Sequence, residues 1–366
     1  MNRRRVVRIA AAAVVGAAVL GLAGCANLGY YWQSASGHVR VMNAARPVSD
    51  WLLDPQADER LKRQLQTAQR IRTFATRALH LPDNPSYTRY ADLRRSAVLW
   101  NVVAAPPLSL TLRTWCFPVA GCVGYRGYYD EAKAQAEADA LRGQGLDVAV
   151  YPVPAYSTLG WMNWAGGDPL LNTFIHYPEG ELARLVLHEL AHQVVYIKDD
   201  TAFNESFATA VERLGVQQWL ESEADETARR EYAQVRQRRE RFHALTRTTR
   251  EQLAAAYATP PTSELGSEAL LARKQGILQN FRDRYAQLRA TWEGDPVRWR
   301  ALDRWVAQAN NATFGAEAAY DTWVPAFEAL FEREGRDWRR FYDAVRQLGD
   351  MPRARREDLL KELSRA

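Results

Sequence analysis

The chain has 366 residues, of which 47% are apolar and 25% are charged. This composition is typical of globular proteins and excludes a disordered, collagen-like or polytopic membrane chain. The formal charge of +5 depends on four arginines in the first 24 residues; without that segment, 44 of the chain's 48 basic residues remain against 43 acidic ones, and no long basic block is left to bind nucleic acid.

The first 25 residues have the pattern of an export signal. Arginines precede an apolar or small-residue run from Ile9 to Ala23, which is too short to serve as a stable membrane-spanning anchor. The run ends in Leu22-Ala23-Gly24-Cys25, which resembles the lipobox of bacterial lipoproteins. The resemblance implies removal of residues 1–24 and lipidation of Cys25, which would tether the chain to a membrane; since residue 26 is Ala rather than Asp, it implies the outer membrane, facing the periplasm. An ordinary cleavage site beside an incidental cysteine is the alternative.

Only Cys116 and Cys122 remain if Cys25 carries lipid. The residues between them include Pro118 and Gly121, which favour a turn, and the periplasm is an oxidising compartment. We therefore expect a disulfide that closes this small loop. Two buried thiols are the alternative, because sequence spacing does not fix the geometry that a disulfide needs.

The first part of the mature chain is expected to be helical and then to change to strands. Asp50 is expected to open a helix, and apolar residues recur at helical spacing from Leu61 to Leu79 within residues 30–80. The next part, about 88–175, contains short β-rich runs bounded by Pro and Gly at 97–103, 108–112 and 147–151. An Ala-rich helix from Asp130 to Arg142, closed by Gly143, separates the last two runs. These patterns predict a small antiparallel or mixed sheet with a crossover helix.

No strand pattern follows Glu179, so the rest of the chain is expected to be helical. Glu and Arg are dense over 221–256, which favours a long exposed helix with i,i+4 ion pairs, and 258–263 is expected to be a loop. Later helices are expected at about 270–292, 297–310 and 316–331, followed by a helical tail from residue 337. The sequence therefore predicts an α+β fold with one domain over 25–366, in which a sheet-containing part (about 88–175) precedes a helical part (about 176–366).

Residues 188–192 read His-Glu-Leu-Ala-His and carry the clearest chemistry in the chain. His188 and His192 are four residues apart in a segment with helical periodicity, so both imidazoles leave the same helix face and can bind one metal ion. Glu189 cannot bind that ion together with them, but it can reach a metal-bound water from the side and act as its general base. Two histidines in an apolar core are the alternative reading.

A second helix is expected to supply the third ligand. Lys198-Asp199-Asp200 predicts a turn with Asp200 as the N-cap of a helix that ends at Gly215. If that helix returns antiparallel to the first, it presents Glu205 to the two histidines, and two His and one Glu form a catalytic zinc set. Glu212 lies seven residues later on the same face and could accept the free N–H of a ligand histidine.

This block resembles the active site of gluzincin metallopeptidases, and Asn204-Glu205-Ser206-Phe207-Ala208 is similar to the Asn-Glu-x-Phe-Ala segment of the large zinc aminopeptidases. The spacing differs, since 12 residues separate His192 from Glu205 where those enzymes have about 18. More closely, the chain resembles a family of bacterial lipoproteins described as predicted aminopeptidases, through the segments 121–128 and 155–161, Asp168-Pro169, the zinc block, and 310–312 with Tyr320. That resemblance makes Tyr320 a candidate for stabilising the oxyanion.

These observations predict an envelope peptidase that uses one zinc ion per chain and Glu189 as general base. The resemblance favours an aminopeptidase; a zinc endopeptidase and a non-catalytic envelope scaffold are the alternatives, and Glu189 argues against the scaffold because a structural zinc site needs no base. The peptide substrate is expected to pair with a β-like edge at Tyr156, Ser157, Thr158, Leu159 and Gly160, shortly before the zinc helix.

Overall fold

The computed structural model describes residues 28–117, 121–258, 264–293 and 299–365. The predicted signal peptide, Cys25 and most of the loop predicted at 258–263 lie outside these ranges. Among the helices that the structure describes, none combines the length and the apolar composition needed to cross a membrane.

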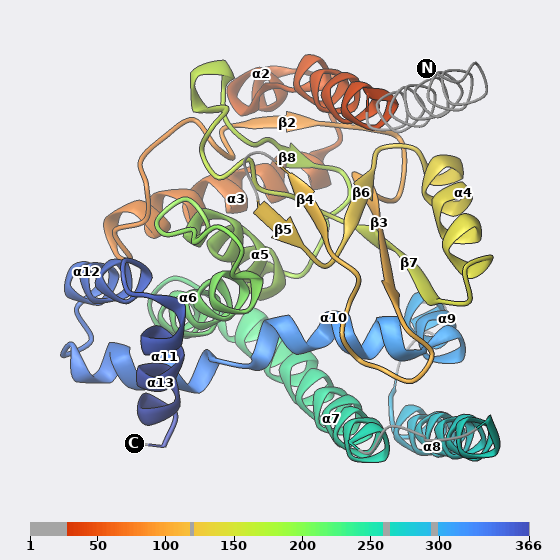
Figure 1. The fold of residues 1–366 in the computed structure, drawn as a ribbon. Helices are drawn as coiled ribbons and strands as arrows, with labels where there is room; N and C mark the ends of the chain where they lie inside the picture. Colours follow the sequence, from red (N-terminus) through yellow and green to blue (C-terminus); the bar gives the residue numbers. More distant parts are fainter. Residues whose placement is uncertain (1–27, 118–120, 259–263, 294–298, 366) are drawn as a thin grey trace, which may run out of the picture.

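Helices hold 62% of the residues and strands 9%, which confirms the predicted α+β class with small sheets early and a large helical region later (Figure 1). The first half contains a helix over 28–44 and three further helices: α2 (Val48–Leu53), α3 (Glu59–Arg77) and α4 (Glu131–Arg142). The second half contains α5 (Glu179–Ala191), α6 (Thr201–Ser222), α7 (Glu226–Tyr257), α8 (Glu264–Ala290), α9 (Arg300–Gln308), α10 (Asn311–Asp321), α11 (Val324–Arg333), α12 (Trp338–Gly349) and α13 (Arg353–Leu363).

The described strands form three small sheets rather than the single sheet predicted. β1 (Arg46–Pro47) pairs antiparallel with β2 (Arg89–Ala91), which pairs parallel with β8 (Leu170–Leu171). β3 (Leu99–Ala105) lies between β6 (Arg126–Tyr128) and β7 (Asp147–Val153) and is antiparallel to both. β4 (Trp115–Phe117) and β5 (Gly121–Val123) pair antiparallel. Because α4 connects β6 to β7 across β3, it is the predicted crossover helix.

The strand predicted at 108–112 is wrong, because this segment is a loop between β3 and β4. Its apolar side chains pack on helices instead of pairing in a sheet. Leu110 contacts the core around α8–α10, and a Cβ on Gly315 of α10 would lie 2.5 Å from the Leu110 carbonyl oxygen and 2.8 Å from the Leu112 side chain. The period-two pattern therefore reflects packing on α10.

Several helix boundaries also differ from the prediction. The helix predicted at 221–256 begins at Glu226, because Asp225 caps it, and it buries Tyr232 and Phe242 rather than lying exposed along its length. The helix predicted at 316–331 is two helices, α10 and α11. In α2, Asp50 lies in the first turn and the helix begins at Val48. Aspartates cap α3, α4, α6, α7 and α12, each accepting an N–H from the first turn of its helix.

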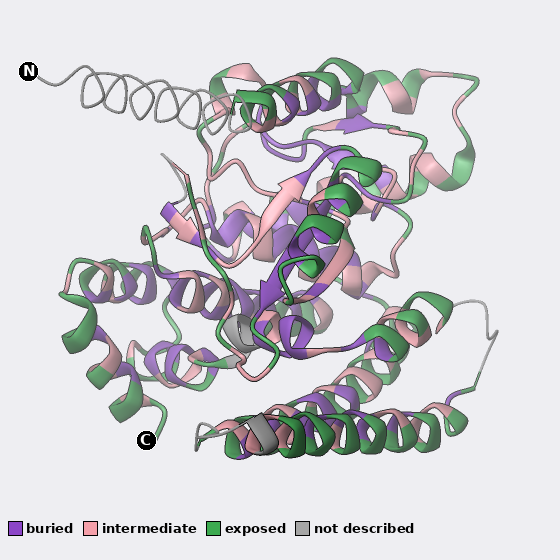
Figure 2. Cartoon of the chain, turned by 45° about the vertical axis from the view of Figure 1, so that its right-hand side comes forward, coloured by how far each residue is buried: buried purple, intermediate pink, exposed green. Residues whose placement is uncertain are grey.

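The main core surrounds α5 and α6. α5 buries Leu182, Val186 and Leu190, and α6 buries Phe203 and Phe207 against apolar residues from α3, α11 and α12. A second apolar cluster joins the distal half of α7 to α8, α9 and α10. The outer helices bury one side and expose the other (Figure 2). The two helices that carry the metal-site sequence therefore lie in the main core of the molecule.

Gly215 does not end α6, which continues to Ser222, so the predicted C-terminus of this helix is wrong. The residue is buried where α6 approaches its neighbours most closely: a Cβ there would lie 2.7 Å from Leu79 and 2.9 Å from Leu187. The glycine is present because the packing leaves no space for a side chain.

We expect Gly215→Ala to lower the free energy of unfolding by about 1–3 kcal/mol, because the methyl group must displace Leu79 or Leu187 in a packed core. Urea denaturation followed by circular dichroism measures the change. Gly276→Ala in α8 is the matched control, since no atom lies within 4 Å of its Cβ; there alanine should raise stability by about 0.5–1 kcal/mol. Equal effects of the two substitutions would contradict the packing explanation.

Candidate metal centre

α5 presents two imidazoles side by side. His188 lies in its last turn and His192 is its C-cap, so the two rings leave the same face four residues apart. Their centroids are 4.9 Å apart and the ring planes are nearly perpendicular, at 84°. Both side chains are largely buried, with 13% and 8% of their surface exposed. The helix therefore holds two nitrogen ligands at a separation that one ion can bridge.

α6 brings Glu205 to these rings. The Glu205 Oε2 atom lies 3.4 Å from His188 Nε2 and 3.8 Å from His192 Nε2. One ligand atom from each of the three residues lies within 4.8 Å of the other two, so the described structure contains a group that could hold a metal ion. The Nε2 atoms of His188 and His192 therefore both face the Glu205 carboxylate.

The connection between α5 and α6 is fixed by the residues that precede Glu205. Asn204 clamps it through both of its side-chain groups: Asn204 Nδ2 donates to the Ile197 carbonyl and Oδ1 accepts from the Ile197 N–H, each at 2.7 Å. Asp200 caps α6, as predicted, and also binds the buried Arg356 of α13 at 2.7 Å. These contacts set the rotation of α6 and thus the direction of Glu205.

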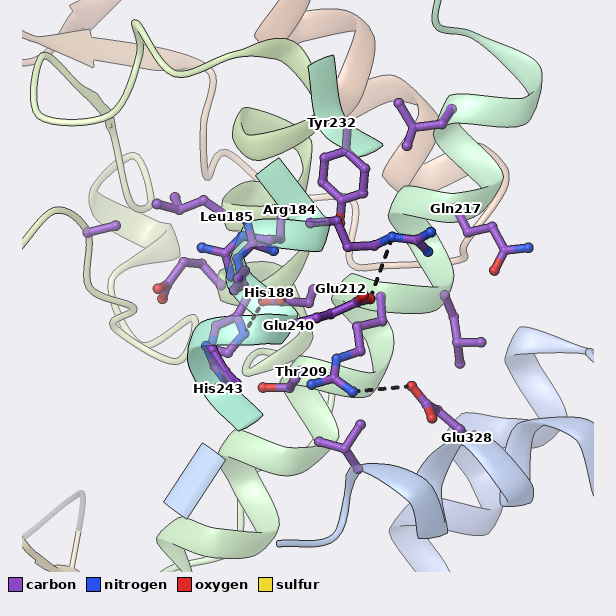
Figure 3. Close-up of a pocket in the computed structure, with 18 of the residues that line it drawn as sticks. Arg184, Leu185, His188, Thr209, Glu212, Gln217, Tyr232, Glu240, His243 and Glu328 are labelled. Atoms are coloured by element: carbon purple, nitrogen blue, oxygen red, sulfur yellow. Dashed lines mark hydrogen bonds and ion pairs between the residues drawn. The ribbon is translucent and has the colours of Figure 1, made fainter. Parts of the chain in front are cut away.

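Glu212 lies where the sequence predicted, next to a ligand histidine. Its Oε2 accepts a hydrogen bond from His188 Nδ1 at 2.9 Å, which leaves Nε2 directed at Glu205. Arg184 donates to both oxygens of Glu212, at 2.9 and 3.2 Å (Figure 3). Arg184 is not among the predicted site residues, although its position is a signal: it lies four residues before His188, on the same face of α5.

The charges of the cluster follow from burial and from these contacts. Burial opposes the charge on His188, but hydrogen bonds to Glu205 and Glu212 outweigh it and raise the pKa of His188 to about 10. Burial lowers the pKa of His192 to about 4. Arg184 and His188 overcome the effect of burial on Glu212 and lower its pKa to about 2, and the two histidines lower the pKa of Glu205. Without a metal ion, the cluster therefore carries one proton on His188 at neutral pH.

Zinc binding is expected to release about one proton per ion at about pH 6, because a ligand imidazole must be neutral and only His188 is protonated there. Below the folded pKa of His192, about 4, a second proton should be released. Calorimetric titration in buffers of different ionisation enthalpy measures the number of protons released per zinc ion. The Glu189→Gln variant is the better sample, since Glu189 then contributes no proton. Zinc binding without proton release would show that the ion does not bind His188.

Glu189 follows His188 and lines a large cavity among the described residues. Burial, helped by the charges of Glu205 and Asp168 and opposed by that of His188, raises the pKa of Glu189 to about 7. A carboxyl group with a pKa near neutrality can accept and return a proton under ordinary conditions. Position and protonation thus both suit the predicted general base.

The cavity has a volume of about 1390 Å³ and extends from His188 and Glu189 between β7, α6, α7 and α11. Figure 3 labels Thr209 and Glu212 of α6 and Glu240 and His243 of α7 among the residues that line it. Its arginines are largely paired with acids, as in the contacts Arg213–Glu328 and Arg236–Glu240. The volume exceeds the 300–1,000 Å³ typical of small-molecule pockets and suits a peptide.

The segment predicted as a β-like substrate edge, Tyr156–Gly160, is not a strand. Leu159 and Gly160 have positive φ values of 55° and 78°, and the Thr158 N–H donates to the Asp168 carboxylate, so no ladder can form. The segment is nevertheless connected to the C-terminal end of α5, because Gln193 Nε2 donates to the same Asp168 carboxylate. None of the five residues lines the cavity, and their contact with substrate stays a prediction.

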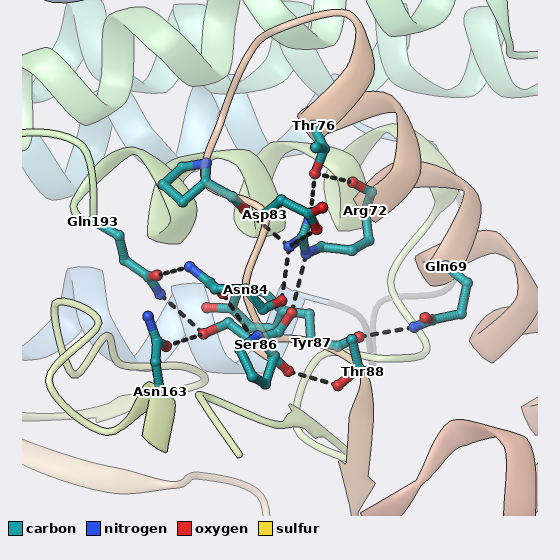
Figure 4. Close-up of polar contacts among 12 residues, drawn as sticks. Gln69, Arg72, Thr76, Asp83, Asn84, Ser86, Tyr87, Thr88, Asn163 and Gln193 are labelled. Atoms are coloured by element: carbon teal, nitrogen blue, oxygen red, sulfur yellow. Dashed lines mark hydrogen bonds and ion pairs between the residues drawn. The ribbon is translucent and has the colours of Figure 1, made fainter. Parts of the chain in front are cut away.

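A polar network near Gln193 holds the chain before β2. Gln193 contacts Asn84 and Ser86, and Arg72 binds the Ser86 carbonyl at 3.1 Å (Figure 4). Tyr87, next to Ser86 of this network, has a positive φ of 64°. Its hydroxyl group is buried and has no hydrogen-bond partner among the described residues. After burial, the charge of Glu189 is the main cause that raises the pKa of Tyr87. Strained residues of this kind are often functional, and no sequence motif marks Tyr87 in advance.

Two further tyrosines occupy different positions relative to the cluster. Tyr320 lies in α10, but its side chain is outside the described part of the structure, so its predicted role is untested. Tyr125 lies between β5 and β6, and after burial the charge of Glu205 is the main cause that raises the pKa of Tyr125. Tyr125 is thus close to the ligand cluster, which the sequence analysis did not predict.

The hairpin that precedes Tyr125 is anchored to the link between α5 and α6. Cys116 and Cys122 form a disulfide across β4 and β5, as expected. The Cys122 N–H donates to Asp199, and a Cβ on Gly121 would lie 2.4 Å from the same carboxylate. Gly121 has a φ of 75°, so glycine is required both by the conformation and by the close approach. The hairpin therefore borders the candidate centre.

Comparison with known proteins gives one match. Residues 29–360 match a family model whose description is "Putative aminopeptidase". No curated protein and no solved structure matches the chain.

Proposed function

Because the chain belongs to the family described as "Putative aminopeptidase", we propose that it hydrolyses peptide bonds with one zinc ion held by His188, His192 and Glu205. The observation that carries the proposal is the convergence of these three ligands beside Glu189 and a peptide-sized cavity. The alternative of two core histidines does not account for Glu205 and Glu212, which contact both nitrogens of His188.

The donor set supports zinc as the metal. Two imidazole nitrogens and one carboxylate are borderline ligands of the kind that zinc prefers, and a set of three protein ligands is typical of catalytic zinc sites. The hydrogen bond from His188 Nδ1 to Glu212 fixes the tautomer that presents Nε2. The residues of the cluster thus fit a catalytic zinc ion.

Zinc in this position would polarise the scissile carbonyl as a Lewis acid and activate water at neutral pH. Glu189 then accepts the proton of the attacking water and delivers it to the leaving amine. Glu212, neutralised by Arg184, keeps the His188 ring in orientation during this transfer. Tyr320 stays a proposed oxyanion donor on resemblance alone, and Tyr125 is a second candidate because its pKa responds to the charge of Glu205.

The family description supports an aminopeptidase over an endopeptidase. Comparing a peptide that has a free amino terminus with its N-acetylated twin tests this choice, with products identified by mass. Release of the first residue from the free peptide alone is the expected result. Cleavage of both peptides at the same internal bond would replace the aminopeptidase by an endopeptidase and leave the zinc mechanism in place.

We also propose that the single domain over 25–366 is lipid-anchored through Cys25 to the outer membrane and faces the periplasm. The sequence Leu22-Ala23-Gly24-Cys25 after an apolar run supports the anchor, and Ala26 supports the outer membrane. Metabolic labelling with a radioactive fatty acid should label the parent chain and not Cys25→Ser; equal labelling of the two would rule out this anchor.

A further inference from the structure

The large apolar side chains that stay exposed are concentrated on one edge of the molecule. In the part of the chain that the structure describes, all but Leu271 of α8 lie in helix 28–44, at the end of α2, or in a turn over 159–167. We define the apolar edge as Leu28, Tyr31, Trp32, Val39, Trp161 and Trp164.

Helix 28–44 is apolar on two opposite faces. Its inner face buries Gly37 and Val41 against the domain. Its outer face exposes Leu28, Trp32 and Val39, which follow at four- and seven-residue spacing and so form one stripe. The outer face of an ordinary surface helix is polar, yet Trp32 is 74% exposed. The outer stripe is therefore suited to a contact outside this domain.

The turn over 159–167 extends this stripe. Trp161 is 66% exposed and Trp164 is 82% exposed. Arg89 links the turn to the end of helix 28–44, because its guanidinium donates to the carbonyls of Met42 and Ala45 and, at 3.5 Å, to that of Ala165. Figure 1 shows helix 28–44, α2 and the yellow-green turn along the upper edge of the view. The turn that carries the two tryptophans is thus held next to the C-terminal end of helix 28–44.

We propose that the apolar edge rests in the interfacial layer of a phospholipid bilayer. Leu28 follows Cys25 by three residues, so at most about 10–11 Å of extended chain separates helix 28–44 from a lipid on Cys25. Tryptophan and tyrosine favour this layer, because their rings are apolar and carry a polar N–H or O–H. The proposal rests on the membrane anchoring proposed above and is independent of peptidase activity.

Charge supports a phospholipid surface rather than another protein. Residues 25–49 contain no Asp or Glu and helix 28–44 carries Arg40, while Arg46, next to the helix, pairs with Asp54 at 3.6 Å. Basic residues at the surface of an anionic bilayer add to its attraction. The docked orientation also leaves the candidate active site accessible, since α7 and α11, which line the cavity, lie on the side of the molecule opposite the apolar edge (Figure 1).

The test measures penetration of these positions into the bilayer, because a lipid tether alone would hold the chain near vesicles without inserting Trp164. The full chain carrying Trp32→Cys or Trp164→Cys is labelled with an environment-sensitive thiol fluorophore and reconstituted into phosphatidylethanolamine–phosphatidylglycerol vesicles. Lipids spin-labelled near the headgroup serve as quenchers. Leu271→Cys is the matched control, since Leu271 is an exposed apolar residue of α8, and the labelled parent chain gives the background.

We expect quenching at both tryptophan positions to exceed that at Leu271 by about threefold or more, as for side chains that enter the interface. Quenching of Trp32→Cys alone would overturn the proposal, because a tether near residue 25 explains it. Equal quenching at Trp164 and Leu271 would also overturn it. A fluorescence shift that appears without vesicles and follows a concentration-dependent increase in mass would assign the edge to a second copy of the chain, again against the proposal.

Discussion

Replacing Glu189 by Gln is expected to reduce peptide hydrolysis by about 10²- to 10⁴-fold while zinc stays bound. The amide has nearly the same shape as the carboxyl group but cannot accept the proton of the attacking water. The three metal ligands are unchanged, so the metal content should stay at one ion per chain. Steady-state rates of peptide cleavage and metal analysis of the same sample measure the two quantities together.

Glu240→Gln is the control for this substitution. Glu240 lines the same cavity from α7 but is exposed and pairs with Arg236 at 3.6 Å, so its loss should change the rate by about twofold or less. Wild-type activity in Glu189→Gln would exclude Glu189 as the base, whereas absence of hydrolysis in both the parent and the variant would favour the scaffold alternative. Loss of zinc from Glu189→Gln would instead show that the residue supports the ligands.

The residues of the candidate metal site could be predicted because their geometry is local. A helix places residues four apart on one face, so the spacing of His188 and His192 suffices to bring them together, and the seven residues between Glu205 and Glu212 align those carboxylates in the same way. Only the antiparallel return of α6 had to be assumed. It is supported by an N-cap at Asp200, which the sequence shows directly.

Features that depend on contacts between distant segments could not be predicted in this way. Gly215 has the sequence character of a helix end, but Leu79 and Leu187 decide its role, and neither is near it in sequence. The alternating residues at 108–112 have the pattern of a strand, yet α10 lies where a partner strand would have to be. Asp168 likewise takes the N–H of Thr158 and prevents the predicted substrate edge from forming a strand.

Replacing any one of the three proposed metal ligands is expected to have the second large effect, which is the loss of bound zinc. Glu205→Ala, His188→Ala and His192→Ala are each expected to abolish stoichiometric zinc, because two remaining protein ligands are too few to hold the ion tightly. Glu212→Ala should weaken zinc binding by only about 10- to 100-fold, the usual effect of losing a group that orients a ligand. Metal analysis after dialysis against a zinc buffer separates the two classes.

Glu212→Gln is the control that separates orientation from charge. Its amide oxygen can still accept the hydrogen bond from His188 Nδ1, but it no longer neutralises Arg184. We expect it to bind zinc more tightly than Glu212→Ala and to be less stable than the parent, because Arg184 then depends on Glu181 alone.

If Glu205→Ala kept full zinc content, Glu212 could not simply replace Glu205 as a ligand, since Glu212 contacts Nδ1 of His188 and Glu205 faces Nε2. Retained zinc would therefore require that the His188 ring turn over or that the ion bind a different set of residues.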